Sequence, residues 1–139
     1  MIVIDFEPEH FKFLELQEKQ EIFNELIKSP EYGLGLKAAG KAWSMFDESL
    51  NCIACGGIID AGFGRGIVWA LLSKYAKLNL VRCTREAIKR LNGFDRLELT
   101  ASFEESRRWA EILGFTCETP EGMKSYAGNE THYLYSRVK

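Results

Sequence analysis

Histidine and proline are scarce in this sequence, and no long apolar run occurs. Only two histidines and three prolines stand among 139 residues, so no Ser-His-Asp triad stands out. No run approaches the roughly 20 apolar residues of a bilayer-spanning helix, and no membrane partner is expected. The sequence also has no large excess of charge of either sign. Eighteen basic and twenty acidic residues give a net charge of −2, which excludes nucleic-acid binding by overall charge.

The chain also lacks signals that would divide or export it. Its start, Met1 to Phe6, has neither a basic segment nor a small-residue cleavage site, and no repeat or Pro/Gly/Ser linker interrupts the sequence. Apolar residues make up 46% and charged residues 27%, a balance typical of a folded protein. We expect a single cytoplasmic domain over residues 1–139, with its four cysteines reduced.

Turn residues and the spacing of apolar residues predict an alternation of strands and helices. Residues 9–28 predict two short helices or one bent helix ended by Ser29-Pro30, and the glycine-rich residues 32–40 predict a loop or a short helix. Residues 80–91 carry the clearest helical stripe. Ser102 and Glu105 predict a capping box for a helix that ends at Leu113, before Gly114. The expected strands are residues 1–6, 41–48, 52–59, 67–73, 96–101, 123–126 and 131–138.

The order of these elements predicts an α/β (α+β) fold with a mixed, mostly antiparallel sheet. Because a helix crosses between residues 67–73 and residues 96–101, these two strands should be parallel neighbours at the centre. Hairpins join the other strands, which should run antiparallel, with helices on both faces. Residues 67–73 are continuously apolar, the profile of a strand buried on both sides.

Two spacings look like binding motifs but are incomplete. Cys52 and Cys55 have the spacing of half a zinc site, yet Cys83 and Cys117 stand alone. Positions i and i+3 of a strand point to opposite faces, so we expect no bound metal and no disulfide. The stretch Gly62-Phe-Gly-Arg-Gly66 matches neither phosphate-binding fingerprint, and a flexible connection is favoured over a phosphate cradle.

The strongest electrostatic feature is a basic helix over residues 82–90, followed by Arg107 and Arg108 on the next helix. It is either a solvated helix face or part of an anion site, because a helix after a buried strand presents free N–H groups to a phosphate. Lys74 and Lys77 lie in the connection where such an anion would sit.

The order of elements resembles the GNAT superfamily of N-acetyltransferases over nearly the whole chain. By motif the resemblance covers the C-terminal half, where Leu113-Gly114-Phe115 precedes a strand and a last hairpin. The sequence is more closely similar to small phage-encoded GNAT-like proteins, the group that includes internal virion protein A. The shared segments are Val68-Trp69-Ala70-Leu71-Leu72-Ser73, Arg108-Trp109-Ala110-Glu111, Pro120-Glu121-Gly122-Met123-Lys124-Ser125-Tyr126 and Tyr135-Ser136-Arg137-Val138.

The resemblance implies that strands 67–73 and 96–101 splay into a V-shaped cleft that binds acetyl-CoA or CoA. Residues 74–80 lack the glycines of the family's pyrophosphate loop, so the lysines there would have to supply charge in place of backbone geometry. The pantetheine would pair with the first strand at Trp69, Leu71, Leu72 and Ser73. The pyrophosphate would lie at Lys74, Lys77, Asn79, Leu80, Val81, Arg82 and Arg85.

Two further family positions differ here. The asparagine that opens the family's next helix aligns with Phe103, and the tyrosine that acts as general acid aligns with Ala110. Acyl transfer still needs a base for the amine and an acid for the departing thiolate. The candidate bases are Glu98 and Asp60, and the candidate acids are Tyr126 and Tyr133.

Two functions follow from the resemblance. The first is N-acyl transfer from acyl-CoA to an amine or protein substrate that the sequence does not name. The second is a non-catalytic role in phage particle assembly or protein interaction, with virion proteins as partners and the host cytoplasm or the virion as its location. Loss of three family features favours the second function, whereas the retained strand 67–73 and the basic helix agree with both. We interpret the chain as a GNAT-fold protein of phage origin with N-acyltransferase ancestry that binds acyl-CoA, and the non-catalytic role is the alternative.

Overall fold

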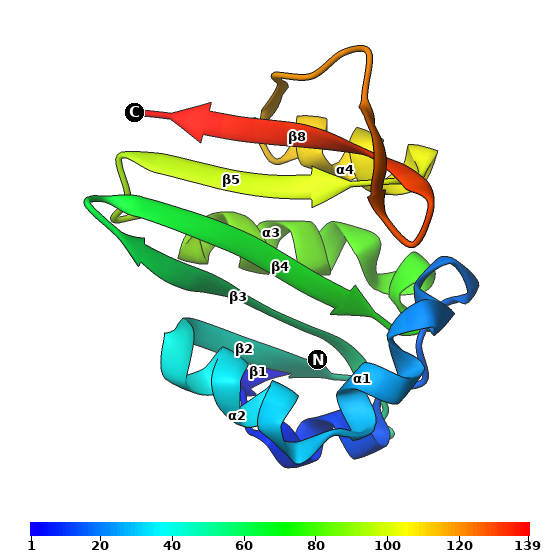
Figure 1. The fold of residues 1–139 in the computed structure, drawn as a ribbon. Helices are drawn as coiled ribbons and strands as arrows, with labels where there is room; N and C mark the ends of the chain where they lie inside the picture. The colour runs from blue at the N-terminus through cyan, green and yellow to red at the C-terminus, as the bar shows by residue number, and fades with distance from the viewer.

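The computed structural model describes all residues, 1–139, and is built on one eight-stranded sheet (Figure 1). The strands follow the order β1-β2-β3-β4-β5-β8-β6, and β7 pairs with β8 outside this path. Every pair is antiparallel except β4–β5, so the predicted mixed sheet is confirmed. The strands are β1 Ile2–Asp5, β2 Gly40–Phe46, β3 Cys52–Gly62, β4 Arg65–Leu72, β5 Arg96–Ala101, β6 Thr116–Cys117, β7 Met123–Ala127 and β8 Glu130–Val138.

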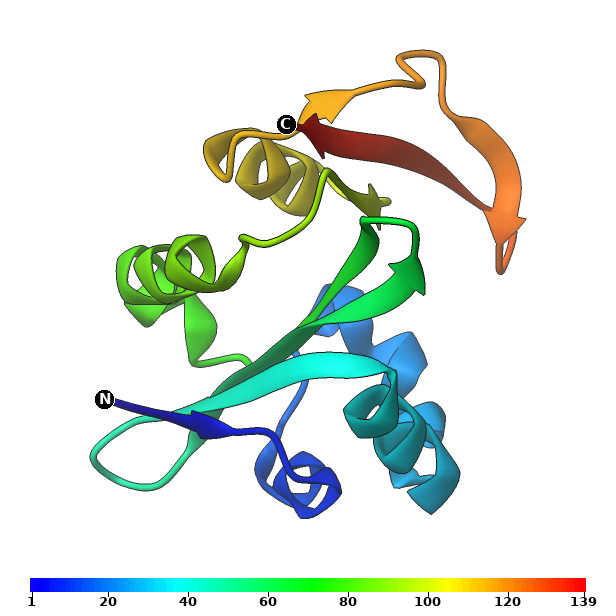
Figure 2. The ribbon, with the colours of Figure 1, turned by 90° about the vertical axis from the view of Figure 1, so that its left-hand side faces the viewer.

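Helices cover both faces of this sheet, as predicted (Figure 2). One face carries α3 (Leu80–Arg90), which follows the 3₁₀ helix η3 (Ala76–Asn79), and α4 (Glu104–Ile112). None of the helices has the length and apolar character that crossing a membrane requires. The opposite face carries the 3₁₀ helices η1 (Pro8–Phe13) and η2 (Glu18–Phe23), and the helices α1 (Asn24–Lys28) and α2 (Pro30–Ala39).

The two helical layers bury two hydrophobic clusters against the sheet. The larger cluster lies against α3 and α4 and includes Leu97, which is 1% exposed. The smaller cluster lies against the N-terminal helices and includes Phe11 and Leu71. Strand β4 contributes to both clusters, since Leu71 points to the smaller one and Leu72 packs on the larger one. A strand between two helical layers needs apolar residues on both sides, which explains the continuous apolar run.

The structure refines two expectations about helix ends. Helix α1 ends at Lys28, before Ser29 and Pro30, as predicted, and Pro30 also begins α2, where its missing N–H leaves no hydrogen bond unmade. Residues 30–39 are therefore helical, which settles the two alternatives for residues 32–40 in favour of a helix. The predicted capping box at Ser102 is displaced by one residue. Phe103 is the N-cap of α4, and its N–H donates to Ser106 Oγ at 3.3 Å. Ser106 at the third helical position takes the part predicted for Glu105, because its hydroxyl can accept from the N-cap N–H as a carboxylate would, and the pattern alone therefore misplaces the start.

The predicted opposite orientation of Cys52 and Cys55 is also wrong. A β-bulge in the β2–β3 ladder pairs Phe46 with Cys52 but Met45 with Ala54, so one extra residue shifts the alternation of side chains. Both sulfurs therefore lie in the smaller cluster, 3.7 Å apart. Both thiols are free and fully buried.

Candidate functional site

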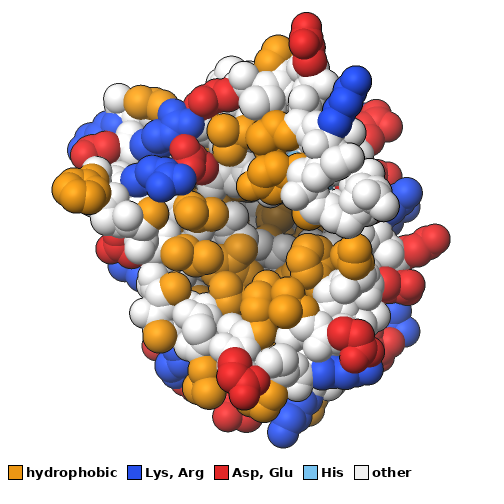
Figure 3. Space-filling model, in the orientation of Figure 1, with side chains coloured by type: hydrophobic (Ala, Val, Ile, Leu, Met, Phe, Trp, Pro, Cys, Tyr) orange, Lys and Arg blue, Asp and Glu red, His pale blue; other side chains and the backbone are white.

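The parallel strands β4 and β5 are paired at one end only. Their register joins Arg65 to Arg96, Gly66 to Leu97 and Ile67 to Glu98, and the pairing stops there. Beyond this point the two strands diverge, as Figure 1 shows. The predicted splay is therefore present, between residues 68–72 of β4 and residues 99–101 of β5, and the space-filling view of Figure 3 shows a hollow there, which we call the cleft.

The closed end of the cleft carries a network of charges. The side chain of Glu98, 13% exposed, accepts hydrogen bonds of 2.7 and 2.9 Å from Arg65 and one of 2.6 Å from Arg96. Arg96 also binds Glu118 at 2.6 Å. The Arg65 guanidinium, and after it that of Arg96, holds the pKa of Glu98 below its usual range. A carboxylate held in this way is a weak base.

The open end of the cleft is hollowed on the face of α1 and α2. Figure 3 shows hydrophobic side chains around this hollow. The β7–β8 hairpin bends toward η2 at this end (Figure 1). A Cβ placed on Gly128, in the hairpin turn, would lie 3.5 Å from Ile22 Cδ1 of η2. The hairpin and η2 therefore meet at the mouth of the cleft.

The cleft-facing edge of β4 is already paired with the chain's own N-terminal region. The side-chain amide of Gln20 donates to Ala70 O at 3.0 Å and accepts from Leu72 N at 2.8 Å. Gln17 N donates to Leu72 O at 3.0 Å. Because β3 pairs along the other side of β4, residues 15–20 lie along the side that faces the cleft.

The connection from β4 to α3 satisfies its own backbone groups. Lys74 N donates to Glu15 O at 2.9 Å, Tyr75 N to Ser73 Oγ at 3.0 Å, and Ala76 N to Ser73 O at 3.0 Å. These three amides are not free for a phosphate. The charge there comes from Lys74 and Lys77, both exposed. Lys74 Nζ pairs with the Glu15 carboxylate at 2.6 Å, which raises the pKa of Lys74.

Four of the predicted cofactor residues share a cavity of about 660 Å³ at the start of α3. Asp47 and Glu48 of the β2–β3 loop also line it, so two carboxylates oppose its two arginines. Lys74, Lys77 and Leu80 do not line this cavity, and the predicted phosphate residues are therefore divided between two places. The four predicted residues that line it are Asn79, Val81, Arg82 and Arg85.

The predicted pantetheine residues of β4 alternate across the strand. Trp69 and Leu71 point toward the N-terminal helices, and Leu72 points toward α3 and α4. Ser73 is buried, and its N–H donates to Ile53 O on β3 at 2.8 Å. Trp69 Nε1 is buried without a hydrogen-bond partner. These side chains therefore cover the two faces of the sheet. The part of β4 that can pair with a ligand is the row of backbone N–H and C=O groups along its edge.

Asp60, one of the predicted bases, lies away from the open end. It stands late in β3, opposite Gly66 in the register, and is exposed. Its Oδ1 accepts a hydrogen bond from Gly62 N at 2.9 Å. This position lies next to the β3–β4 turn, at the closed end of the cleft.

The tyrosines predicted as acids lie at the open end. Tyr133 is opposite Ala101, the last residue of β5, and the Arg107 guanidinium lies 3.5 Å from the centre of its ring. Tyr126 is 55% exposed, and its ring centre lies 5.2 Å from that of His132. His132 Nδ1 is buried without a hydrogen-bond partner. An imidazole with an unpaired nitrogen therefore stands beside Tyr126, one of the two predicted acids.

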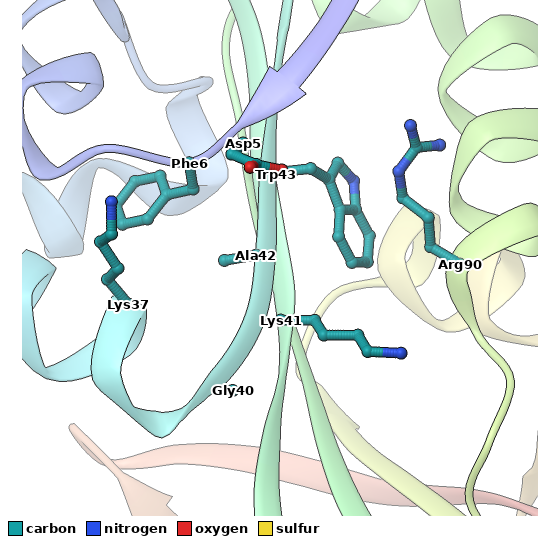
Figure 4. A pocket seen from close by; sticks show the side chains of 8 residues that line it. All are labelled: Asp5, Phe6, Lys37, Gly40, Lys41, Ala42, Trp43 and Arg90. Atoms are coloured by element: carbon teal, nitrogen blue, oxygen red, sulfur yellow. The ribbon is translucent and has the colours of Figure 1, made fainter.

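A separate cavity of about 380 Å³ lies outside the cleft (Figure 4). Trp43 and Arg90 lie on one side of it and Lys37 and Phe6 on the other. Arg90 lies 5.7 Å from the Trp43 ring centre and binds Glu86 at 2.7 Å, so it braces α3 against β2. No residue of β4 or β5 and no predicted site residue lines this cavity.

Sequence reasoning misses two residues of the site: Gln20, which the structure brings to the edge of β4, and His132, which it brings beside Tyr126. Gln20 belongs to the polar stretch 17–21 that interrupts the helical stripe, and this interruption is the only signal of a special segment. No sequence pattern marks His132, because its place beside Tyr126 depends on the pairing of β7 with β8.

A mixed sheet whose central parallel strands splay, with helices on both faces, is the fold of GNAT acetyltransferases. A GNAT-family acetyltransferase from Bacillus anthracis matches with a TM-score of 0.68 at 11% identity, over 98% of this chain and 93% of that chain. A mutant of the spermidine N-acetyltransferase SpeG from Vibrio cholerae matches with a TM-score of 0.66 at 12% identity, over 99% and 95%. A provisionally named acetyltransferase from Acinetobacter baylyi matches with a TM-score of 0.69 at 12% identity, over 99% and 92%.

The likeness is one of fold. The sequence matches no protein-family model and no curated protein. The similarity to phage-encoded proteins is not tested by these structures and stays a prediction.

Proposed function

We propose that this chain binds acyl-CoA in the β4–β5 cleft and transfers the acyl group to an amine. The observation that carries the proposal is the splay, with three register pairs at the closed end and divergent strands beyond them. An extended ligand with peptide-like amides can pair with such a strand edge, and the pantetheine of CoA is a ligand of this kind. The fold shared with GNAT-family and spermidine acetyltransferases supports the same reaction class.

Different residues along the cleft would bind the pyrophosphate, take the proton of the amine and protonate the thiolate. Lys74 and Lys77 would neutralise the pyrophosphate, since the amides of their connection are already bonded. Glu98 is a weak base because two arginines hold it. His132, beside Tyr126, is the better-placed group for taking the amine proton, because imidazole is the usual proton-transfer group in enzymes. Tyr126 or Tyr133 would protonate the departing thiolate.

We further propose that the acceptor is an amine on an apolar body. The hollow at the cleft mouth is surrounded by hydrophobic side chains (Figure 3). The carboxylates Glu98 and Glu118 lie at the closed end, away from this hollow, and both are ion-paired with Arg96.

A second candidate is a non-catalytic protein that keeps the fold. The pairing of Gln20 with Ala70 and Leu72 favours it, because a permanently occupied edge would leave no place for pantetheine. In this alternative, residues 15–20 complete the sheet, and the molecule acts through its surface. For this candidate, the resemblance to phage proteins implies a role in the phage particle, with virion proteins as partners.

Thermal unfolding with added acetyl-CoA and CoA separates the two candidates. A ligand present at a hundred times its Kd stabilises a folded protein by about 2.7 kcal/mol, which raises the Tm of a chain of this length by several degrees. We expect a saturable rise with both compounds and a smaller one with ADP, which lacks the pantetheine. No rise at millimolar acetyl-CoA would favour the non-catalytic protein.

A further inference from the structure

Residues 15–20 occupy the edge of β4 with the hydrogen bonds that a peptide strand would make. The Gln20 amide presents its Nε2 donor to Ala70 O and its Oε1 acceptor to Leu72 N. One side-chain amide thereby reproduces the donor and acceptor of a neighbouring strand. Gln17 Nε2 donates to Gln20 Oε1 at 3.1 Å and fixes the orientation of the amide. An amide of a bound ligand would need these same two backbone groups.

The segment that provides Gln20 is lightly held. No residue from 17 through 32 is fully buried, and the apolar side chains that pack against the smaller cluster, Phe23, Ile27 and Tyr32, are only partly buried. The residues before it are well anchored, since Leu14 is 5% exposed and Leu16 is 8% exposed. A segment with few buried apolar contacts opens at a low free energy while its anchor stays in place. We therefore expect the segment to detach from β4 beginning at Gln17, the first residue after the anchored Leu16.

We infer that residues 17–20 form a displaceable strap that competes with the pantetheine of acyl-CoA for Ala70 and Leu72. This inference rests on the proposed function, and it adds a regulation of the same cleft. Only molecules with the strap released can pair with the ligand, so the apparent Kd equals the Kd of the open form divided by the fraction of molecules that are open. The strap also keeps the β4 edge from pairing with other chains while the cleft is empty.

Calorimetric titration of CoA into three proteins tests the strap. The proteins are the wild type, Gln20→Ala and the matched control Asn24→Ala, which removes an amide from the same segment at a residue whose side chain makes no hydrogen bond. Releasing two hydrogen bonds should tighten CoA binding of Gln20→Ala several-fold, up to about tenfold. Asn24→Ala should keep the wild-type Kd. Gln20→Glu, which keeps the acceptor for Leu72 N but loses the donor to Ala70 O, should give a Kd between those of the wild type and Gln20→Ala.

The outcomes separate the strap from the function it rests on. Equal Kd values in all proteins would overturn the strap and leave the proposed function standing. Binding by Gln20→Ala with no measurable binding by the wild type would support both. No binding by any of the proteins at millimolar CoA would overturn the proposed function and the strap with it. Hydrogen exchange gives a second readout, since saturating CoA should speed amide exchange in residues 17–28, and unchanged exchange there would contradict the strap.

Discussion

Arg65 on β4 and Glu98 on β5 join the two strands at the closed end of the cleft. The guanidinium makes two hydrogen bonds, of 2.7 and 2.9 Å, to one carboxylate oxygen, and Arg96 holds the other oxygen at 2.6 Å. The register ends at Glu98, and the strands diverge from there. This pair therefore stands where the cleft begins.

Glu98→Gln should reduce the stability of the protein at neutral pH but not in acid. The folded pKa of Glu98 lies below its ordinary value of 4.5, so its contribution is present above that value and is lost as the pH falls through the folded pKa. We expect the variant to lose about 1–2 kcal/mol of unfolding free energy at pH 7, because its arginine partners are partly exposed. Urea unfolding at pH 7 and at pH 3 measures the difference, which should shrink at the lower pH.

The matched control for this prediction is Glu104→Gln. Glu104 pairs with Arg108 at 2.9 Å, but both side chains are mostly exposed, so the variant should unfold like the wild type. A loss in Glu98→Gln no larger than that in the control would mean that the Arg65–Glu98 pair does not hold the strands together.

Leu97→Ala should destabilise the protein by about 2–5 kcal/mol, because it empties a fully enclosed position of the larger cluster. Leu78→Ala makes the same change at a side chain that is 90% exposed and should have little effect. Denaturant midpoints of the two variants provide the comparison. Similar stability of both would show that β5 is not packed under α3 and α4.

The buried thiols should be inert in the native protein. Contact with Cys55, and then burial, raises the pKa of Cys52, and burial raises the pKa of Cys83 to about 11. Because the thiolate is the reactive form, a short iodoacetamide pulse at pH 8 should label Cys117 first and the others only after denaturation. Mass spectrometry counts the labels. Rapid native labelling of Cys52 or Cys55, or stoichiometric zinc in protein purified without added metal, would contradict this picture of the pair.

Lys74→Ala combined with Lys77→Ala should weaken CoA binding at least about tenfold, and more at low salt, because both cations serve a diphosphate in an exposed place. The control is Lys12→Ala combined with Lys124→Ala, which removes the same charge from exposed lysines of η1 and β7. Titration at two salt concentrations measures both. Wild-type affinity in the first double variant would move the phosphate site to the cavity of Arg82 and Arg85.

Much of the fold can be predicted from the sequence because its signals are local. The strand over Arg96–Ala101 and the start of the helix at Leu80 follow from short apolar patterns, and the parallel pair follows from the crossover between them. The left-handed Gly114, with φ of 91°, ends α4 where glycine is expected. Two helix starts differ slightly from the prediction. The N-cap of α4 is Phe103 rather than Ser102, and α2 begins at Pro30 rather than at residue 32.

The candidate site is harder to predict because its contacts are distant in the sequence. Gln20 reaches β4 residues fifty positions away, and no local pattern announces that contact. The bulge that turns Cys52 toward Cys55 depends on how β2 pairs with β3, and a strand's alternation alone gives the opposite orientation. Charged residues such as Glu98 can be read from the sequence, but the pairing of Glu98 with the two arginines that lower its pKa cannot.

A crystal structure of the protein with CoA would show directly whether the ligand takes the place of Gln20. We expect pantetheine between β4 and β5, with its amides on Ala70 and Leu72, its pyrophosphate near Lys74 and Lys77, and Gln20 displaced from the strand edge. Crystals grown in millimolar CoA that show the Gln20 hydrogen bonds intact and no pantetheine in the cleft would contradict this expectation.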